Sequence, residues 1–142
     1  MKKILLVFAM FISALTFAQT QLLSFNELPA TAQQFISKNF DANAITHVVM
    51  EKEFLSNDYK VLMNDGTKLE FNDKGIWKEV DAEYSAVPAQ LIPDAIKKYI
   101  NTKFPNASVV KLETKRYGYA VELKSGLELE FDKNGKFLRI DD

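Results

Sequence analysis

Histidine is the side chain best suited to acid–base catalysis near neutral pH, and it occurs once in this chain of 142 residues, as His47. A Ser-His-Asp triad would have to use it, but no Gly-x-Ser-x-Gly segment is present to hold a serine nucleophile. A single imidazole on a strand is far more often solvated or partner-facing than catalytic. We therefore predict that the protein has no catalytic residues and is not an enzyme.

Metal chemistry has little support in the sequence. Cysteine is absent, which excludes disulfides, thiol nucleophiles, lipid attachment through a thiol and zinc sites built on thiolates. Residues 132–135 (Asp-Lys-Asn-Gly) look like part of a calcium loop, but its regular oxygen ligands and closing glutamate are missing. Glu70 and Glu130, with Glu128 on the same side, could suggest a carboxylate pair for acid–base work, but lysines alternate with them, as in ordinary cross-strand ion pairs. We predict no metal site and no cofactor.

Charge and the amino-terminal segment point to an exported protein. The net charge of −1 lacks the basic excess that nucleic-acid binding needs, so no nucleic-acid partner is predicted. Lys2 and Lys3 precede an uncharged, largely apolar run, residues 4–18, which is shorter than the roughly 20 residues of a spanning helix. This pattern predicts a signal peptide, residues 1–18, cleaved after Ala18; an uncleaved anchor or a buried helix is the alternative. The location would be periplasmic or secreted, without stable membrane insertion after cleavage.

An internal repeat predicts the domain organisation. Leu28-Pro29 aligns with Ile92-Pro93, and Leu69-Glu70-Phe71 aligns with Leu129-Glu130-Phe131. The resulting units are a lead-in (19–27), repeat 1 (28–81), a linker (82–91) and repeat 2 (92–142). The copies differ most in one strand connection, which is longer at residues 53–58 than at residues 116–118. Loops absorb such insertions at little cost.

Each repeat predicts one helix followed by four strands. The helices begin near Pro29 and Pro93 with apolar residues at helical spacing, and they end by Phe40 and Phe104. Turn residues then separate short alternating segments, too close together for crossover helices. The expected strands are residues 45–54, 59–63, 67–71 and 76–80, then 109–115, 119–124, 127–131 and 136–140. The fold class is α+β, with two tandem α-β4 repeats that form one antiparallel sheet.

Alternation assigns the two faces of this sheet. One face is apolar and should be covered by the helices; it carries Tyr59, Val61, Met63, Leu69, Phe71 and Val80, with Tyr119, Val121, Leu123, Leu129, Phe131 and Ile140. The other face should be solvated, and its candidate partner-binding residues are Trp77, Phe137, Leu62, His47, Lys60, Lys68, Glu70, Glu79, Glu122, Glu130 and Arg139. Trp77 and Phe137 are costly to expose without a use. The alternative is that these two rings cover the sheet edge or pack beneath the linker.

Several segments together resemble the PepSY-like family of exported bacterial proteins. They are Leu28-Pro29 with its helix, Phe104-Pro105-Asn106-Ala107 leading into a strand, Tyr119-Ala120-Val121-Glu122-Leu123, and Leu129-Glu130-Phe131-Asp132 with Gly135. The resemblance spans about residues 27–142 in two copies, and the first copy, with Asp41-Ala42-Asn43, is the more divergent. It implies a fold similar to the beta-lactamase inhibitory protein, with helices on one side of a continuous sheet and an open concave face on the other. PepSY domains are associated with restraining peptidases, and the inhibitory protein binds its enzyme through the sheet face.

These observations favour a non-catalytic exported binding module that engages an unidentified protein partner through the open sheet face. The resemblance makes a peptidase or another envelope enzyme the candidate partner, with inhibition as the outcome. Spaced aromatics on a charged surface match the composition of recognition surfaces. The alternative is a small-ligand carrier or sensor that uses the same concave face, with Trp77 as a stacking platform.

Overall fold

The computed structural model describes residues 19–141, and the predicted signal peptide, residues 1–18, lies outside them. The first part of the chain contains the strand β1 (Gln19–Leu23), the helix α1 (Ala30–Asn39) and the strands β2 (Ile45–Lys52), β3 (Asn57–Met63), β4 (Lys68–Phe71) and β5 (Trp77–Asp81). The second part contains α2 (Asp94–Lys103), β6 (Val109–Thr114), β7 (Gly118–Leu123), β8 (Glu128–Asp132) and β9 (Phe137–Asp141). Strand β1 lies in the predicted lead-in and was not expected from the sequence.

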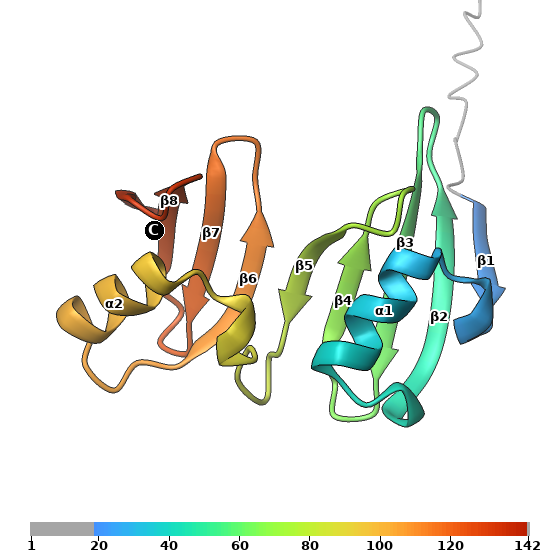
Figure 1. The fold of residues 1–142 in the computed structure, drawn as a ribbon, viewed down its shortest axis with the longest axis horizontal. Coiled ribbons are helices and arrows are strands. Elements are labelled where there is room, and N and C mark those ends of the chain that lie inside the picture. Colours follow the sequence, from blue (N-terminus) through green and yellow to red (C-terminus); the bar gives the residue numbers. More distant parts are fainter. Residues whose placement is uncertain (1–18, 142) are drawn as a thin grey trace, which may run out of the picture.

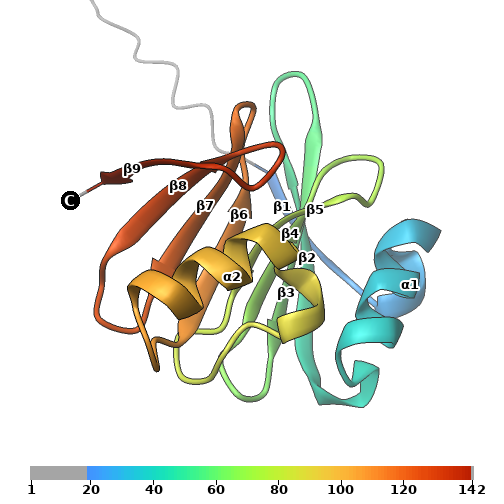
Figure 2. The same cartoon turned by 60° about the vertical axis from the view of Figure 1, so that its left-hand side comes forward.

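All nine strands form one antiparallel sheet in which each strand pairs with its neighbours along the chain. Both helices lie on the same side of this sheet (Figures 1 and 2). The expected α+β class, with one open antiparallel sheet, is therefore confirmed. None of the helices within residues 19–141 is long and apolar enough to cross a membrane.

The two helices are placed alike by their first residues. Pro29 and Pro93 are the N-cap residues, with φ near −52°, a value that the proline ring favours. Proline has no backbone N–H group, so none is left without a partner at this position. Gly75 and Gly135 pass close beneath the first turns of the helices, with φ of 78° and 80°. A Cβ atom at Gly75 would lie 2.7 Å from Pro29 Cβ. These turns therefore fix each helix against its own strands.

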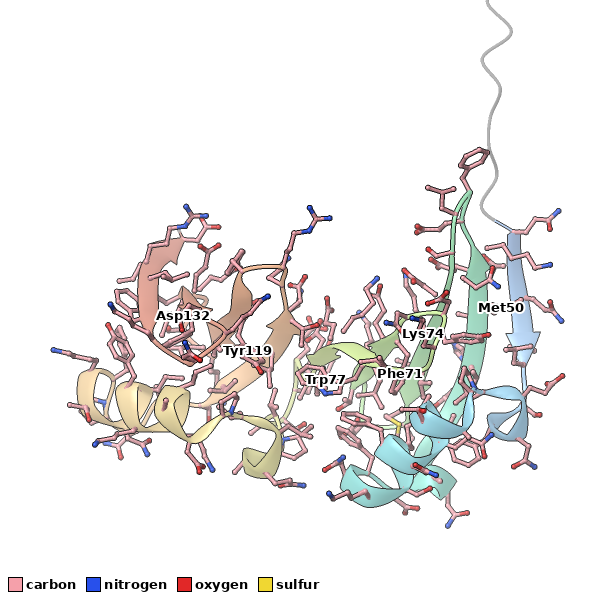
Figure 3. The ribbon with its side chains drawn as sticks, turned by 45° about the horizontal axis from the view of Figure 1, so that its top comes forward. Met50, Phe71, Lys74, Trp77, Tyr119 and Asp132 are labelled. Atoms are coloured by element: carbon pink, nitrogen blue, oxygen red, sulfur yellow. The ribbon has the colours of Figure 1, made fainter. Side chains whose placement is uncertain are left out.

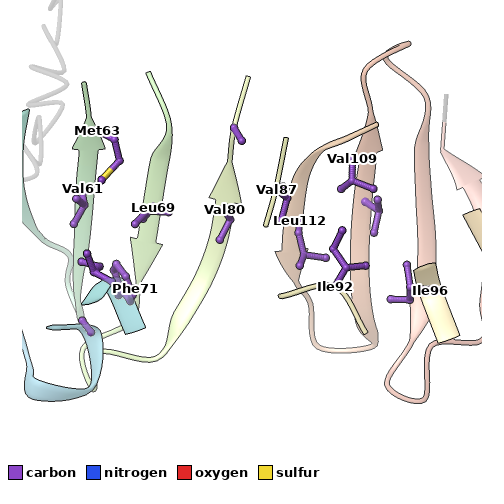
Figure 4. Close-up of a cluster of buried hydrophobic side chains, with 14 of the residues drawn as sticks. Val61, Met63, Leu69, Phe71, Val80, Val87, Ile92, Ile96, Val109 and Leu112 are labelled. Atoms are coloured by element: carbon purple, nitrogen blue, oxygen red, sulfur yellow. The ribbon is translucent and has the colours of Figure 1, made fainter. Parts of the chain in front are cut away.

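The hydrophobic core fills the space between the helices and the sheet (Figure 4). Phe71 and Phe131 are both fully buried, as the alternation predicts. Ile140, which was expected on the same face, is 45% exposed, whereas Val80 in the corresponding place is 0% exposed. The difference arises because β9 is the edge strand of the sheet, whereas β5 lies between β4 and β6.

The expected position of Trp77 and Phe137 on the open face is wrong. A register shift between Glu70 and Phe71 leaves Lys78 without a partner on β4, so that Trp77 pairs with Phe71. This β-bulge moves Trp77 to the helix side, and the same shift on β8 moves Phe137 there as well. Strict alternation, on which the expectation rested, fails at one residue in each of these strands.

Each ring completes an aromatic cluster beneath its helix. Figure 3 labels Trp77 and Phe71 of the first cluster. Trp77 stacks on Phe35 of α1 with ring centroids 5.9 Å apart and an interplanar angle of 24°. Phe137 stacks on Tyr99 of α2 at 4.7 Å and 10°. Both helix rings also meet the buried strand phenylalanine edge-on, at a distance of 5.5 Å in each case. Trp77 and Phe137 are half-buried parts of the core.

Candidate binding surface

The open face is the surface of the sheet that points away from the helices. Its charged side chains come from strands β2 to β9. The acidic ones are Glu51, Asp58, Glu70, Glu79, Asp81, Glu113, Glu122, Glu128, Glu130 and Asp141. The basic ones are Lys60, Lys68, Lys78, Lys111, Lys115 and Arg139. Acidic groups therefore outnumber basic groups on this face.

The bulge residue Lys78 organises the first part of the open face. Its Nζ atom lies 2.9 Å from a carboxylate oxygen of Asp58 and 3.3 Å from one of Glu70. Asp58 is buried, and this ion pair compensates the charge that it keeps there. Burial lowers the pKa of the Lys78 ammonium, but its two carboxylate partners outweigh this and hold that pKa above its usual value. The bulge thus places the Lys78 ammonium group between two carboxylates and compensates part of their charge.

A shallow hollow of about 380 Å³ lies beside this ion pair, over strands β2 to β5. Its lining includes His47, Leu62, Lys68, Glu70 and Glu79. His47 and Lys68 are exposed, and neither forms an ion pair among residues 19–141. The hollow therefore presents two uncommitted nitrogen groups beside an apolar side chain.

Carboxylates crowd together at the centre of the open face, where β5 pairs with β6. Glu79 lies directly opposite Glu113, and Lys111 Nζ is 3.5 Å from a carboxylate oxygen of Glu79. Burial raises the pKa of Glu79, and the charges of Glu113, Glu70 and Asp81 raise it further, while Lys111 opposes them. The negative charges of this cluster are therefore only partly compensated by Lys111.

Glu130, on β8, is the most buried carboxylate of the open face, at 6% exposed. It forms an ion pair with Arg139 and accepts a hydrogen bond from Tyr117, and both interactions lower its pKa. Burial and this hydrogen bond raise the pKa of Tyr117 to about 12. Carboxylate oxygens of Glu128 and Asp141 come within 4.8 Å of each other and of Glu130. Arg139 already compensates Glu130, so one of these three carboxylates is engaged in an ion pair within the protein.

Nine of the eleven predicted site residues lie on the open face, namely His47, Lys60, Leu62, Lys68, Glu70, Glu79, Glu122, Glu130 and Arg139. Trp77 and Phe137 do not; they line two hollows on the helix side, of about 400 and 500 Å³. Sequence reasoning missed Lys78 and Asp58. One signal was available for Lys78, since strict alternation would have buried its charge beside Val80.

Comparisons with known proteins show which family and which solved structures this chain is similar to. Residues 57–139 match the family model described as beta-lactamase-inhibitor-like and PepSY-like. A periplasmic protein of the DUF2874 family from Bacteroides vulgatus is 41% identical, with a TM-score of 0.82 over 87% of this chain and 98% of its own.

Two further solved structures cover the same 87% of this chain, each with a TM-score of 0.82. One, from Bacteroides thetaiotaomicron, is named as a calcium-regulated periplasmic protein; it is 37% identical over 97% of its own length. The other, a Bacteroides vulgatus periplasmic protein of unknown function, is 36% identical over its whole length. No curated protein matches the chain. The predicted periplasmic or secreted location agrees with the periplasmic location of all three neighbours and is confirmed.

Proposed function

The chain belongs to the PepSY-like family, and on this basis we propose that it is a non-catalytic exported binding module whose open face engages a protein partner. The observation that carries the proposal is the division of the sheet into two unlike surfaces. Both helices and the aromatic clusters cover one side, so that side supplies stability. The other side displays charged groups, and neither α1 nor α2 covers it.

The charges of the open face favour a partner with a basic contact surface. Acidic side chains outnumber basic ones there, and the central carboxylates around Glu79 gain from an added positive charge. Complementary charge speeds the encounter of two proteins and disfavours wrong partners. Close to this centre, Glu122 forms no ion pair among the described residues and is half-buried, so it offers a free carboxylate.

The partner we propose is a peptidase or another envelope enzyme, which the protein inhibits. The beta-lactamase-inhibitor-like description of the family supports this type of partner. A protein without a nucleophile–base pair cannot process such a partner, but it can block access to the partner's active site.

Calcium is not part of the proposed binding mechanism. One neighbour is named as calcium-regulated, and within residues 19–141 Glu128, Glu130 and Asp141 bring three carboxylates close together. However, Arg139 already forms an ion pair with Glu130, the most buried of these three carboxylates. We propose that the open face binds its partner without a metal ion.

A pair of matched charge reversals tests the proposal. Tagged wild-type protein, Glu122→Lys and Asp73→Lys are used to capture partners from the periplasm, and quantitative mass spectrometry compares the captured proteins. Asp73 is exposed in the turn between β4 and β5, away from the open face, and undergoes the same change of charge. We expect one enzyme to be captured by the wild type and by Asp73→Lys, but about tenfold less by Glu122→Lys.

The captured enzyme is then assayed with increasing amounts of the wild-type protein. A falling rate supports inhibition, and an unchanged rate supports binding without inhibition. Equal capture by all three proteins would show that the open face is not the binding surface.

The second candidate function is a small-ligand carrier. The observation that favours it is the hollow of about 380 Å³, which lies at the lower end of the size range of ligand pockets. Trp77 cannot serve as its stacking platform, because its ring lies against Phe35 on the other side of the sheet. A thermal-shift screen distinguishes the two functions, since a carrier is stabilised by its ligand and the stabilisation is lost in Lys68→Ala.

A further inference from the structure

We propose that the hairpin between β2 and β3 docks this protein on an anionic lipid surface. The tip of this hairpin carries Phe54 and Leu55, which are 99% and 89% exposed. Two adjacent large apolar side chains with almost no contact to the rest of the fold do not contribute to its stability. Such exposure is typical of a site that is covered by something else.

The backbone of the tip forms a hydrogen-bonded turn that holds both side chains at the end of the hairpin. The N–H group of Glu53 donates a hydrogen bond of 2.8 Å to the carbonyl oxygen of Ser56, which closes a tight turn. Phe54 and Leu55 occupy the two central positions of this turn. Neither Phe54 nor Leu55 has a positive φ, so most residue types can adopt the backbone of this turn. Turn formation therefore does not explain why phenylalanine and leucine stand there.

The hairpin between β6 and β7 supplies a second, smaller tip at this end of the sheet, with one basic and one aromatic residue. Lys115 and Gly118 exchange backbone hydrogen bonds of 2.8 and 3.1 Å, which leaves Arg116 and Tyr117 at the tip between β6 and β7. Both residues are exposed, and Tyr117 is 38% exposed. Because the strands are antiparallel and follow one another in order, both hairpins project from the same end of the sheet, as Figure 1 shows.

The charge at this end fits anionic lipid headgroups. The connections here carry several exposed basic residues and only two exposed acidic ones: Lys74, Lys115, Arg116, Lys133 and Lys136 against Glu53 and Asp73. The short turns at the opposite end carry Asp65 and Lys124, and the linker carries Glu83. A cluster of basic groups around inserted apolar side chains is the pattern of a peripheral membrane contact.

The position of β1 agrees with this orientation. Gln19, the first residue of β1, pairs with Lys52 at the base of the β2–β3 hairpin. The residues before Gln19 in the sequence are the predicted signal peptide. A lipid surface also needs no matching cavity for Phe54 and Leu55, which a protein partner would have to supply.

The test compares two matched double variants in vesicle sedimentation. Phe54→Ser/Leu55→Ser removes the two apolar side chains of the tip. The control, Leu22→Ser/Tyr84→Ser, removes one leucine and one aromatic side chain elsewhere on the surface; Leu22 is 71% exposed and Tyr84 is 78% exposed. Each protein is purified in its exported form from the periplasm, and its mass establishes the amino terminus. All forms then share the same terminus, so the apolar run of residues 4–18 cannot explain a difference between them.

We expect the wild type and the control variant to bind vesicles that contain phosphatidylglycerol. Binding should be weaker on vesicles of phosphatidylcholine alone and in high salt, because both reduce the attraction of the basic groups. The Phe54→Ser/Leu55→Ser variant should bind about tenfold or more weakly, because it loses the apolar part of the contact. Equal binding by the two variants would overturn the proposal.

A second readout reports the surroundings of the tip rather than the amount of protein bound. Tryptophan fluorescence of Phe54→Trp should shift to the blue when phosphatidylglycerol vesicles are added, whereas that of Tyr84→Trp should not. The native Trp77 gives both variants the same background signal. Absence of the shift would overturn lipid insertion. Concentration-dependent self-association in sedimentation velocity, lost in Phe54→Ser/Leu55→Ser and without vesicle binding, would instead make the tip a contact between copies of this chain.

Discussion

Replacing Trp77 by alanine tests whether this ring belongs to the core or to a binding surface. A tryptophan buries roughly 150–250 Å² when it is enclosed, so the partly exposed ring of Trp77 buries at least about 100 Å². At about 25 cal/mol/Å² this burial contributes roughly 2.5 kcal/mol or more, and stacking on Phe35 adds about 0.5–1.5 kcal/mol. We expect Trp77→Ala to lower the free energy of unfolding by about 3–4 kcal/mol.

Equilibrium urea unfolding followed by circular dichroism measures this loss. Circular dichroism is needed because Trp77 is the only tryptophan, and its removal abolishes the fluorescence signal. Phe71→Ala, at a fully buried ring, should cost about 3–5 kcal/mol, and Phe54→Ala, at a 99% exposed ring, should cost less than about 0.5 kcal/mol. The two variants bracket the result for Trp77.

A double-mutant cycle with Phe35→Ala isolates the contact between the two rings. The stacked geometry predicts a coupling of about 0.5–1.5 kcal/mol between Phe35 and Trp77. A coupling of zero, together with a Trp77→Ala variant as stable as Phe54→Ala, would refute the bulge and restore Trp77 to the open face.

Four further predictions concern titration, metal binding and processing. An alkaline absorbance titration should show one tyrosine with a pKa of about 12, and this titration should be absent in Tyr117→Phe. Because the pKa of Tyr117 is raised in the folded protein, its contribution to the free energy of unfolding should fall as the pH rises from about 10 to 12. The raised pKa of Glu79 means that its ionised form lowers the stability of the fold, so Glu79→Gln should raise the melting temperature at pH 7. At pH 3 it should not, because the glutamate and the glutamine that replaces it are then both neutral. Neither EDTA nor calcium should move the melting temperature, and a calcium-induced rise lost in Glu128→Gln would reveal a cation site. Intact-mass spectrometry of the exported protein should find Gln19 at its amino terminus.

Much of the fold could be predicted because its signals are local and duplicated. Pro29 and Pro93 mark the helix starts, and the turn glycines mark the hairpins in both halves. Strand β1 was missed because its sequence, Gln-Thr-Gln-Leu-Leu, has neither strong alternation nor β-branched apolar residues, and it forms by pairing with β2. Pairing partners that are distant in the sequence leave no local pattern to read.

The candidate surface was predicted less well because a single inserted residue changes the face of its neighbours. Alternation placed Trp77 and Glu79 on one face, and the bulge at Lys78 separates them. The corresponding bulge residue in β9 is Leu138, which is apolar and therefore fits an alternating pattern without conflict. Only the charge of Lys78 distinguishes a bulge from a regular strand, and it does so in one half of the sheet alone.

The same comparison of halves indicates where function resides in this molecule. The buried rings correspond closely, since Phe35, Phe71 and Trp77 have the geometry of Tyr99, Phe131 and Phe137. Exposed positions differ instead. Lys78 bridges two carboxylates in the first half, whereas the corresponding Leu138 is 48% exposed. The β2–β3 hairpin carries Phe54 and Leu55 at its tip, whereas the β6–β7 hairpin carries Arg116 and Tyr117. A core that needs the same packing in both halves explains the correspondence of the rings. Stability places no such demand on the hairpin tips or the open face, so their differences are best explained by what each surface contacts.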